Sequence, residues 1–382
     1  MRGSASAICQ LAEADRSAVQ TTFMKKIKIL HIIPSLLPGG AEKMAALLAE
    51  FSNPEKFSIG ILCLKAGGLW EEKLIKQGIP VTIVGSLNRP IIFDFFKIVK
   101  AIKNFSPDIV HTHLFGGDFY GRICARLAGV KKIISTEQNV NFSEGKLRKL
   151  AKFLTSLLAI RIVAASKAIK KYLIADEGVA PEKIEVIYNG VETDKFSPLA
   201  RDYKPSGRPL VVGSIGRLTE QKGFDYLLEA LAKIKEVECL IAGEGEEKEN
   251  LEKKIKMLGL DRRVKLVGLQ KDVPQFLRSL DVFVLPSRWE GFGIVLLEAG
   301  LSGLPIIASR VDGILEIIED GLNGWLFEKG NVEELADKLK KILAEPAARA
   351  RLGKNIREKV LDKFEIKKIV KQYEDLYLKI LT

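Results

Sequence analysis

Short apolar runs alternate with amphipathic stretches along almost the whole chain. Runs with the character of buried strands occupy residues 28–33, 58–64, 80–84, 109–111, 132–136 and 161–165 in the first half, and 210–216, 238–242, 264–267, 282–285 and 305–308 in the second. Stretches with helical spacing lie between most of them. Strands that are separated by helices pair in parallel through right-handed crossovers. The sequence therefore predicts an α/β fold built on parallel sheets.

The length of the chain divides this fold into two domains. A chain of 382 residues exceeds what one hydrophobic core usually organises. Two prolines and a glycine within residues 201–209 indicate a linker. This places a first Rossmann-like domain at 24–200 and a second at 210–362, facing each other across a cleft. Residues 363–382 are expected to form a terminal helix.

Residues 1–23 differ in character from the rest of the chain. The first four residues resemble an expression leader, and the segment lacks the long apolar core of a signal peptide. Met24 has the position of a natural start, because a strand follows at once. We expect residues 1–23 to lie outside the fold.

The net charge of +12, from 60 basic and 48 acidic residues, suggests an anionic partner. Nucleic acid, an anionic lipid surface and an anionic small substrate are the candidates. Aromatic residues make up 7% of the chain and basic residues alternate with acidic ones along helices, so we rank lipid and nucleotide above nucleic acid. The four cysteines lack metal or redox spacing, and no long apolar run lacks a charge. A cytoplasmic protein without a membrane span is expected.

The most informative loop follows the apolar run 282–285. Gly291 and Gly293 lie where the chain turns from strand to helix, and Glu290 precedes them. Glycines let the backbone approach a ligand closely, and the first N–H groups of a helix favour an anion. Glu298 lies about one turn inside the predicted helix, where its carboxylate can bind hydroxyl groups. The pattern fits a site for a diphosphate and sugar hydroxyls.

Two further loops carry groups suited to phosphate. The first apolar run of the second half ends at Gly216, and Arg217 and Lys222 then bring two cations into one loop. Arginine can bind phosphate through two parallel hydrogen bonds, and lysine acts as a mobile point charge. Near the start of the chain, Gly39 and Gly40 lead into a helix without the G-x-G-x-x-G pattern of a dinucleotide site.

Two glutamates eight residues apart around Gly-Phe-Gly, together with the cation pair and the glycine pair, resemble the E-x7-E signature and donor site of the retaining glycosyltransferases of family GT4. These belong to the glycogen-synthase-like superfamily with the GT-B architecture. The resemblance implies two Rossmann-like domains facing a central cleft, with a C-terminal helix that crosses back to the first domain. It extends over nearly the whole chain. The turn at 312–316 resembles a family motif but lacks its proline and one glycine, so we assign it structural weight only.

The resemblance also implies a donor site made from both domains. The residues expected to contact the phosphates are Gly39, Gly40, Gly216, Arg217 and Lys222. Those expected to contact the sugar, the ribose and the base are Glu290, Phe292, Gly293, Ile294, Glu298 and Leu269. Arg217 and Lys222 would stabilise the departing diphosphate, Glu290 would hold the sugar, and Glu298 would hold the ribose hydroxyls. No metal is expected, since the chain contains no Asp-x-Asp.

His113 is a further candidate catalytic residue. It lies just past the end of the predicted strand 109–111, where its side chain could reach a sugar. A histidine at such a position is by itself more often structural. In the GT4 resemblance, however, a histidine at the end of this strand faces the transferred sugar, which favours His113 as catalytic and leaves His111 as structural.

Residues 145–158 form a basic amphipathic segment. Leucines recur at helical spacing, with Lys146, Arg148, Lys149 and Lys152 between them. One interpretation is a helix that packs its leucines on the core and exposes a basic face. The other is a surface that docks on anionic lipid, where related enzymes meet lipid acceptors.

Together these features predict a retaining glycosyltransferase that moves a sugar from a nucleotide-diphosphate sugar to an acceptor hydroxyl, without a further cofactor. UDP is the preferred nucleotide, with GDP or ADP as alternatives. The expected acceptor is a bacterial polysaccharide, a glycolipid or a lipid-linked glycan, in the cytoplasm or at the inner face of the membrane. A non-hydrolysing sugar-nucleotide epimerase and a non-catalytic nucleotide-sugar-binding protein stay open as alternatives.

Overall fold

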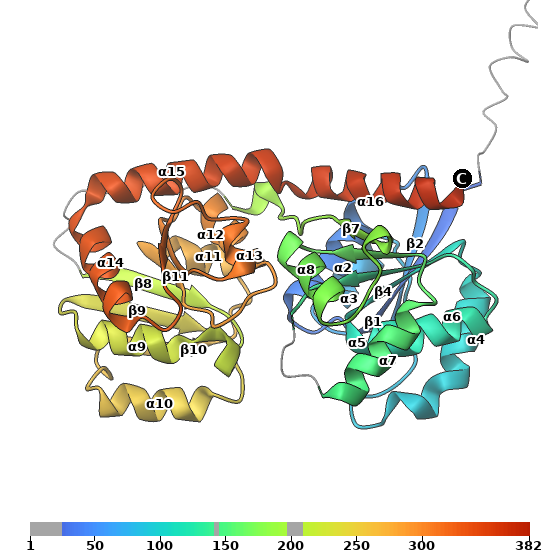
Figure 1. The fold of residues 1–382 in the computed structure, drawn as a ribbon, viewed down its shortest axis with the longest axis horizontal. Coiled ribbons are helices and arrows are strands. Elements are labelled where there is room, and N and C mark those ends of the chain that lie inside the picture. Colours follow the sequence, from blue (N-terminus) through green and yellow to red (C-terminus); the bar gives the residue numbers. More distant parts are fainter. Residues whose placement is uncertain (1–24, 141–144, 197–208) are drawn as a thin grey trace, which may run out of the picture.

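The computed structural model describes residues 25–140, 145–196 and 209–382, so the predicted leader and nearly all of the predicted linker lie outside the described residues. The described chain forms two α/β domains side by side, each with a parallel sheet flanked by helices (Figure 1). The predicted fold class, with two Rossmann-like domains, is confirmed.

The first domain is built on a seven-stranded sheet in the order β3-β2-β1-β4-β5-β6-β7. Its strands are β1 (Ile27–Ser35), β2 (Phe57–Ala66), β3 (Val81–Ile83), β4 (Ile109–His113), β5 (Ile133–Glu137), β6 (Arg161–Ala164) and β7 (Ile184–Val186). Its helices are α2 (Gly40–Phe51), α3 (Glu71–Lys76), η1 (Ile91–Asp94), α4 (Phe95–Phe105), α5 (Leu114–Gly116), η2 (Gly117–Gly121), α6 (Arg122–Leu127), α7 (Lys146–Ser156), α8 (Lys167–Ala175), η3 (Pro181–Lys183) and η4 (Thr193–Lys195). The central strands are buried on both faces because helices cover both sides of the sheet.

The second domain has a six-stranded parallel sheet in the order β10-β9-β8-β11-β12-β13. Its strands are β8 (Leu210–Ile215), β9 (Val237–Ala242), β10 (Val264–Gly268), β11 (Val282–Leu285), β12 (Ile306–Ser309) and β13 (Trp325–Phe327). Its helices are η5 (Glu220–Lys222), α9 (Phe224–Ala232), α10 (Lys248–Met257), α11 (Val273–Arg278), α12 (Ile294–Leu301), α13 (Asp312–Leu315), α14 (Val332–Ala344) and α15 (Pro346–Lys363).

Every strand predicted from an apolar run is present, with small shifts at the ends. The sequence did not predict β7 and β13, which have three residues each. Segments this short contain too few residues to display a period, and only their neighbours in the sheet define them.

The last helix, α16 (Ile366–Leu381), crosses from the second domain back to the first, as predicted (Figure 1). Where the chain crosses, the N–H of Val191 donates to the carbonyl of Phe364 at 2.9 Å, and the N–H of Ile366 donates to the carbonyl of Val191 at 3.0 Å. The apolar face of α16 then joins the core of the first domain, with Tyr373 and Tyr377 buried. The core of the first domain is therefore built from both the early and the last described parts of the chain.

The orientation of helix α7 differs from the first interpretation of this segment, in which its leucines pack on the core. Its leucines face outward, with Leu147 exposed over 82% of its surface, whereas Lys152 is buried. Nζ of Lys152 lies 2.5 Å from a carboxylate oxygen of Glu177 and 3.5 Å from one of Glu137. The core-packing interpretation is therefore wrong, and Lys152 does not belong to the basic face. No helix among the described residues combines the length and apolarity that crossing a bilayer requires.

Candidate active site

A cavity of about 960 Å³ lies between the two domains. Loops that follow the carboxyl ends of strands in both sheets surround it, which is where open α/β sheets bind ligands. The predicted site residues that line it are Gly39, Gly40, Gly216, Arg217, Lys222, Leu269, Glu290, Phe292, Gly293, Ile294 and Glu298. The fold thus brings together residues that the sequence places in four separate segments. His113 does not line this cavity.

Glu290 lies in the loop between β11 and α12, with 7% of its surface exposed. Its Oε2 accepts a hydrogen bond from Nζ of Lys222 at 2.5 Å and another from Oγ of Ser287 at 3.2 Å. Gly293 has a φ of +88°, which side-chain-bearing residues rarely adopt, and the next residue begins α12. The turn therefore presents a paired carboxylate and the N-terminus of a helix to the same cavity.

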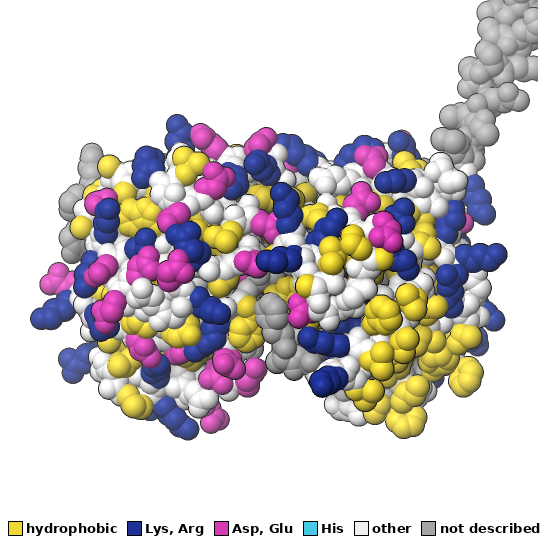
Figure 2. All heavy atoms as spheres, in the orientation of Figure 1, with side chains coloured by type: hydrophobic (Ala, Val, Ile, Leu, Met, Phe, Trp, Pro, Cys, Tyr) yellow, Lys and Arg dark blue, Asp and Glu magenta, His cyan; other side chains and the backbone are white. Residues whose placement is uncertain are grey.

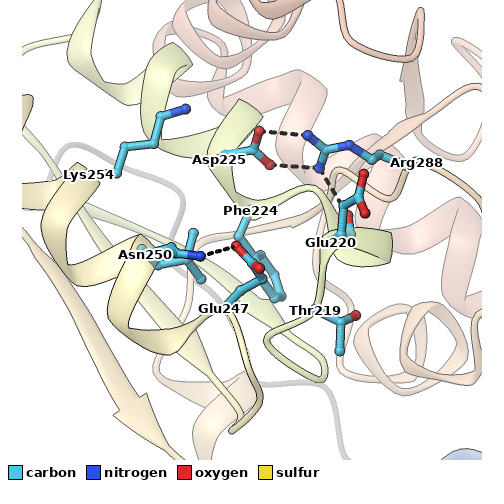
Figure 3. Close-up of a pocket in the computed structure, with 9 residues that line it drawn as sticks. Thr219, Glu220, Phe224, Asp225, Glu247, Asn250, Lys254 and Arg288 are labelled. Atoms are coloured by element: carbon cyan, nitrogen blue, oxygen red, sulfur yellow. Dashed lines mark hydrogen bonds and ion pairs between the residues drawn. The ribbon is translucent and has the colours of Figure 1, made fainter.

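Arg288, in the loop after β11, forms hydrogen bonds with residues that follow β8 (Figure 3). Its Nη1 and Nη2 donate to the two carboxylate oxygens of Asp225 at 2.8 and 2.7 Å, and Nη1 also donates to the carbonyl of Glu220 at 2.9 Å. Its backbone N–H donates to the carbonyl of Gln221 at 2.7 Å. A two-pronged bond of this kind fixes geometry as well as charge. The two loops therefore form one unit, beside a second cavity of about 240 Å³ (Figure 3).

The sequence analysis gave Arg288 no role. Its partner Asp225 lies 63 positions earlier in the chain, and no local spacing signals that contact. The only available signal was the position of Arg288 two residues before Glu290.

The first turn of α2 supplies two charged side chains that the sequence analysis also left unassigned. Lys43 forms an ion pair with Glu298 of the second domain. Glu42 lines the cavity, and its carboxylate lies over Gly39. Burial raises the pKa of Glu42, while a backbone amide and the charge of Arg217 act in the opposite direction. The signal that could have found them is the charge pair Glu42-Lys43, which follows Gly39 and Gly40 after a single alanine.

Hydrogen bonds join the two domains beside the cavity. Oγ of Ser166 donates to the carbonyl of Gly291 at 2.6 Å. The carboxylate of Glu316 accepts from the N–H groups of Lys167 and Ala168, at 3.0 and 2.9 Å. Glu316 thus caps the N-terminus of α8 from the other domain. The turn that carries Glu316, expected to be structural, takes part in holding the domains together.

The structure buries His113, which was predicted to face a sugar, away from the cavity lining. Strand β4 extends through His113, which has no exposed surface, and its Nε2 lies 2.8 Å from Nδ1 of His31 on the adjacent strand. His111 has the structural position that was predicted for it. Its Nδ1 and Nε2 are hydrogen-bonded to the hydroxyls of Tyr377 and Thr136, each at 2.7 Å.

The three histidines form one buried cluster, in which one nitrogen of each ring lies within 4.8 Å of the others. Burial lowers the pKa of His31 to about 3. Burial also holds the pKa values of His111 and His113 well below the usual value, and the neighbouring histidines lower them further. The cluster is therefore uncharged at neutral pH, and through Tyr377 it connects the first sheet to α16.

Comparison with known proteins gives matches over nearly the whole chain. Residues 38–195 match the family described as Glycosyltransferase Family 4, and residues 198–359 match the family described as Glycosyl transferases group 1. The chain is 31% identical to a UDP-Gal:alpha-D-GlcNAc-diphosphoundecaprenol alpha-1,3-galactosyltransferase of Escherichia coli, over 92% of this chain and 97% of that protein. It is 30% identical to an N-acetyl-alpha-D-glucosaminyl L-malate synthase of Bacillus anthracis, over 75% of this chain and 78% of that protein. The structure of Anabaena Alr3699/HepE in complex with UDP-glucose is 25% identical, with a TM-score of 0.83 over 92% of this chain and 100% of that one.

Proposed function

The chain is a glycosyltransferase of family 4 with the GT-B architecture, and we propose that it transfers a sugar from a UDP-sugar to a hydroxyl of a lipid-linked glycan with retention of configuration. The observation that carries this proposal is that Lys222, Glu290 and Glu298 line the same cavity as Gly39 and Gly40 at the start of α2. The Escherichia coli relative, named for UDP-Gal and a diphosphoundecaprenol acceptor, and the Anabaena structure with UDP-glucose support these substrate classes.

In this proposal the donor binds mainly to the second domain. Leu269 packs on the base, and Glu298 accepts hydrogen bonds from the ribose hydroxyls. The diphosphate lies near the N-terminus of α12, whose unpaired N–H groups and partial positive charge favour an anion. Gly39 and Gly40 approach the phosphates from the first domain, where the absence of side chains leaves room.

Arg217 and Lys222 provide the fixed positive field that a departing diphosphate needs. The acceptor oxygen forms a bond to the anomeric carbon on the face from which the diphosphate leaves. The bond from that carbon to the diphosphate breaks, and a phosphate oxygen accepts the proton of the acceptor hydroxyl. Glu290 holds the sugar in place, and no protein nucleophile is required, consistent with the burial of His113.

The alternative functions, a sugar-nucleotide epimerase and a non-catalytic binding protein, receive no support from the relatives described above. A binding protein would need Glu298 but would have no use for a buried Lys222–Glu290 pair aimed at the same cavity.

Nucleotide binding tests the donor assignment. We expect UDP to raise the thermal unfolding temperature in the presence of a chelator, and GDP and ADP to do so less. At a hundredfold excess over its Kd, a ligand stabilises the folded state by about 2.7 kcal/mol. Glu298→Gln should remove most of the shift, because the amide donates as well as accepts and carries no charge. Equal shifts with all three nucleotides would contradict a uridine preference, and no shift with any of them would contradict the proposed donor site.

An anionic membrane surface is the second partner that we propose. Large apolar side chains of the first domain are exposed on η1, α4, α6 and α7, and Figure 2 shows hydrophobic side chains gathered over this part of the domain. The most exposed are Phe93, Phe96, Leu127, Leu147 and Leu157. Lysines at 97, 100, 103 and 146 are exposed among them, and the acidic Asp94 is buried. An exposed apolar patch with a basic surround matches an anionic bilayer, which is also where a lipid-linked acceptor would reside.

Vesicle binding tests this surface. We expect the protein to sediment with vesicles that contain phosphatidylglycerol and not with pure phosphatidylcholine vesicles. Phe96→Ser, at a side chain that is 86% exposed, should weaken binding about tenfold, and Lys146→Glu with Lys149→Glu should weaken it further. Met257→Ser is the matched control, since Met257 is 85% exposed on the second domain. Equal losses in the control, or a Phe96-dependent dimer in solution, would contradict membrane docking.

A further inference from the structure

Lys43 reaches across the cavity from one domain to the other. It lies in the first turn of α2, 255 positions before Glu298, and its Nζ pairs with Oε1 of Glu298 on α12. The exposed fractions of the two side chains are 15% and 9%, so the pair is largely withdrawn from water. Nζ of Lys43 also lies 5.6 Å from the centre of the Phe196 ring. The lysine is therefore held in a defined place rather than extended into solvent.

The N-termini of α2 and α12 approach each other closely at this point. A Cβ atom on Gly40 would lie 3.2 Å from Cδ1 of Ile294, the first residue of α12. A lysine in the first turn of α2 can form an ion pair with Glu298 only while the N-termini of α2 and α12 stay this close. The ion pair is thus a contact that requires this approach of the two domains.

Glu298 has the capacity to bind two partners at once. A carboxylate offers two oxygens and about four lone pairs, and Lys43 contacts Oε1. The remaining lone pairs can accept hydrogen bonds from two adjacent hydroxyls. The residue proposed to hold the ribose is therefore the same residue that receives a cation from the opposite domain.

We propose that Lys43 is a positioning residue that couples closure of the first domain to occupancy of the ribose site. This inference rests on the proposed function. Lys43 fixes the orientation of the Glu298 carboxylate, and a ribose held by that carboxylate in turn keeps the lysine and α2 in place. Donor binding and domain closure then favour each other through a single shared carboxylate.

Lys43→Met tests the coupling, because methionine keeps an unbranched apolar stem and removes the charge. We expect the Kd for UDP, measured by calorimetry, to rise about tenfold and kcat/KM for transfer to fall about tenfold to a hundredfold. Lys43→Arg should restore most of both losses. The matched control is Lys359→Met on α15, where the lysine side chain is 13% exposed and pairs with Glu319 at 2.7 Å away from the cavity. This control should bind UDP and transfer sugar as the unmodified protein does.

A double-mutant cycle separates coupling from a general structural effect. In a Glu298→Gln background, Lys43→Met should change the UDP Kd by less than about threefold, because the shared carboxylate is already gone. Small-angle scattering at saturating UDP should show a larger radius of gyration for Lys43→Met than for the unmodified protein. Additive effects of the two substitutions, or unchanged UDP affinity in Lys43→Met, would overturn the coupling alone. Absence of UDP binding in the unmodified protein would instead overturn the proposed function.

Discussion

Replacing Lys222 by methionine is expected to lower kcat for sugar transfer by about two to three orders of magnitude, the usual loss when one fixed group that stabilises transition-state charge is removed. Lys222 has its Nζ at 2.5 Å from Glu290, and 13% of its side chain is exposed. In the proposed mechanism its charge acts on the departing diphosphate, and water screens that charge little because the side chain is mostly buried. Initial rates at saturating donor measure the loss.

The kinetic loss should exceed any loss of nucleotide binding. Without Lys222, Glu290 retains its hydrogen bond from Ser287 at 3.2 Å, so the loop keeps one of its contacts. We expect the UDP Kd to rise about tenfold, since a phosphate contact disappears in the ground state as well. Lys340→Met serves as the control, because Lys340 makes an exposed ion pair with Asp337 on α14. A transfer rate within threefold of the unmodified protein would remove Lys222 from the chemistry.

Acidification from pH 8 to pH 5 is expected to destabilise the protein through its buried histidines. In the unfolded chain a histidine binds a proton near pH 6.5, whereas the folded state holds the pKa of His31 at about 3. The unfolded state therefore binds more protons below pH 6.5, and stability falls as the pH decreases through the range between the two values. The loss is about 1.4 kcal/mol per pH unit for each such histidine. His111 and His113 act in the same direction.

Thermal unfolding measured at several pH values tests this linkage. Glu137 acts in the opposite direction, because burial raises its pKa to about 7 and its protonation on acidification favours the folded state. The unmodified protein must therefore be compared with a variant that lacks a single histidine and keeps Glu137. His31→Leu removes one titrating ring while filling a similar volume, and it should reduce the histidine contribution to the fall in stability between pH 6.5 and 5 by about a third. The variant loses a hydrogen bond to His113 at every pH, so the slope with pH is the diagnostic quantity. An unchanged slope would exclude His31 as a source.

The loops that line the cavity were predictable from the sequence where each is a local strand–loop–helix signal. The apolar run that becomes β11 is followed by Glu290 and Gly293, and a strand must deliver such a loop to the carboxyl edge of its sheet. The same logic applies to Lys222 after β8 and to Gly40 after β1. In both parallel sheets these loops follow the carboxyl ends of the strands. Loops from distant parts of the chain therefore meet in one cavity.

The sequence by itself determined the α/β class, the division into two domains and most of the loops that line the cavity, because apolar periodicity and glycine placement act over short distances along the chain. Only the tertiary structure decided that His113 is buried against His31, that the leucines of α7 face outward, and that Lys43 pairs with Glu298. Each of these depends on which face of an element meets another element. That choice is made by packing between residues far apart in the sequence, and no local spacing encodes it.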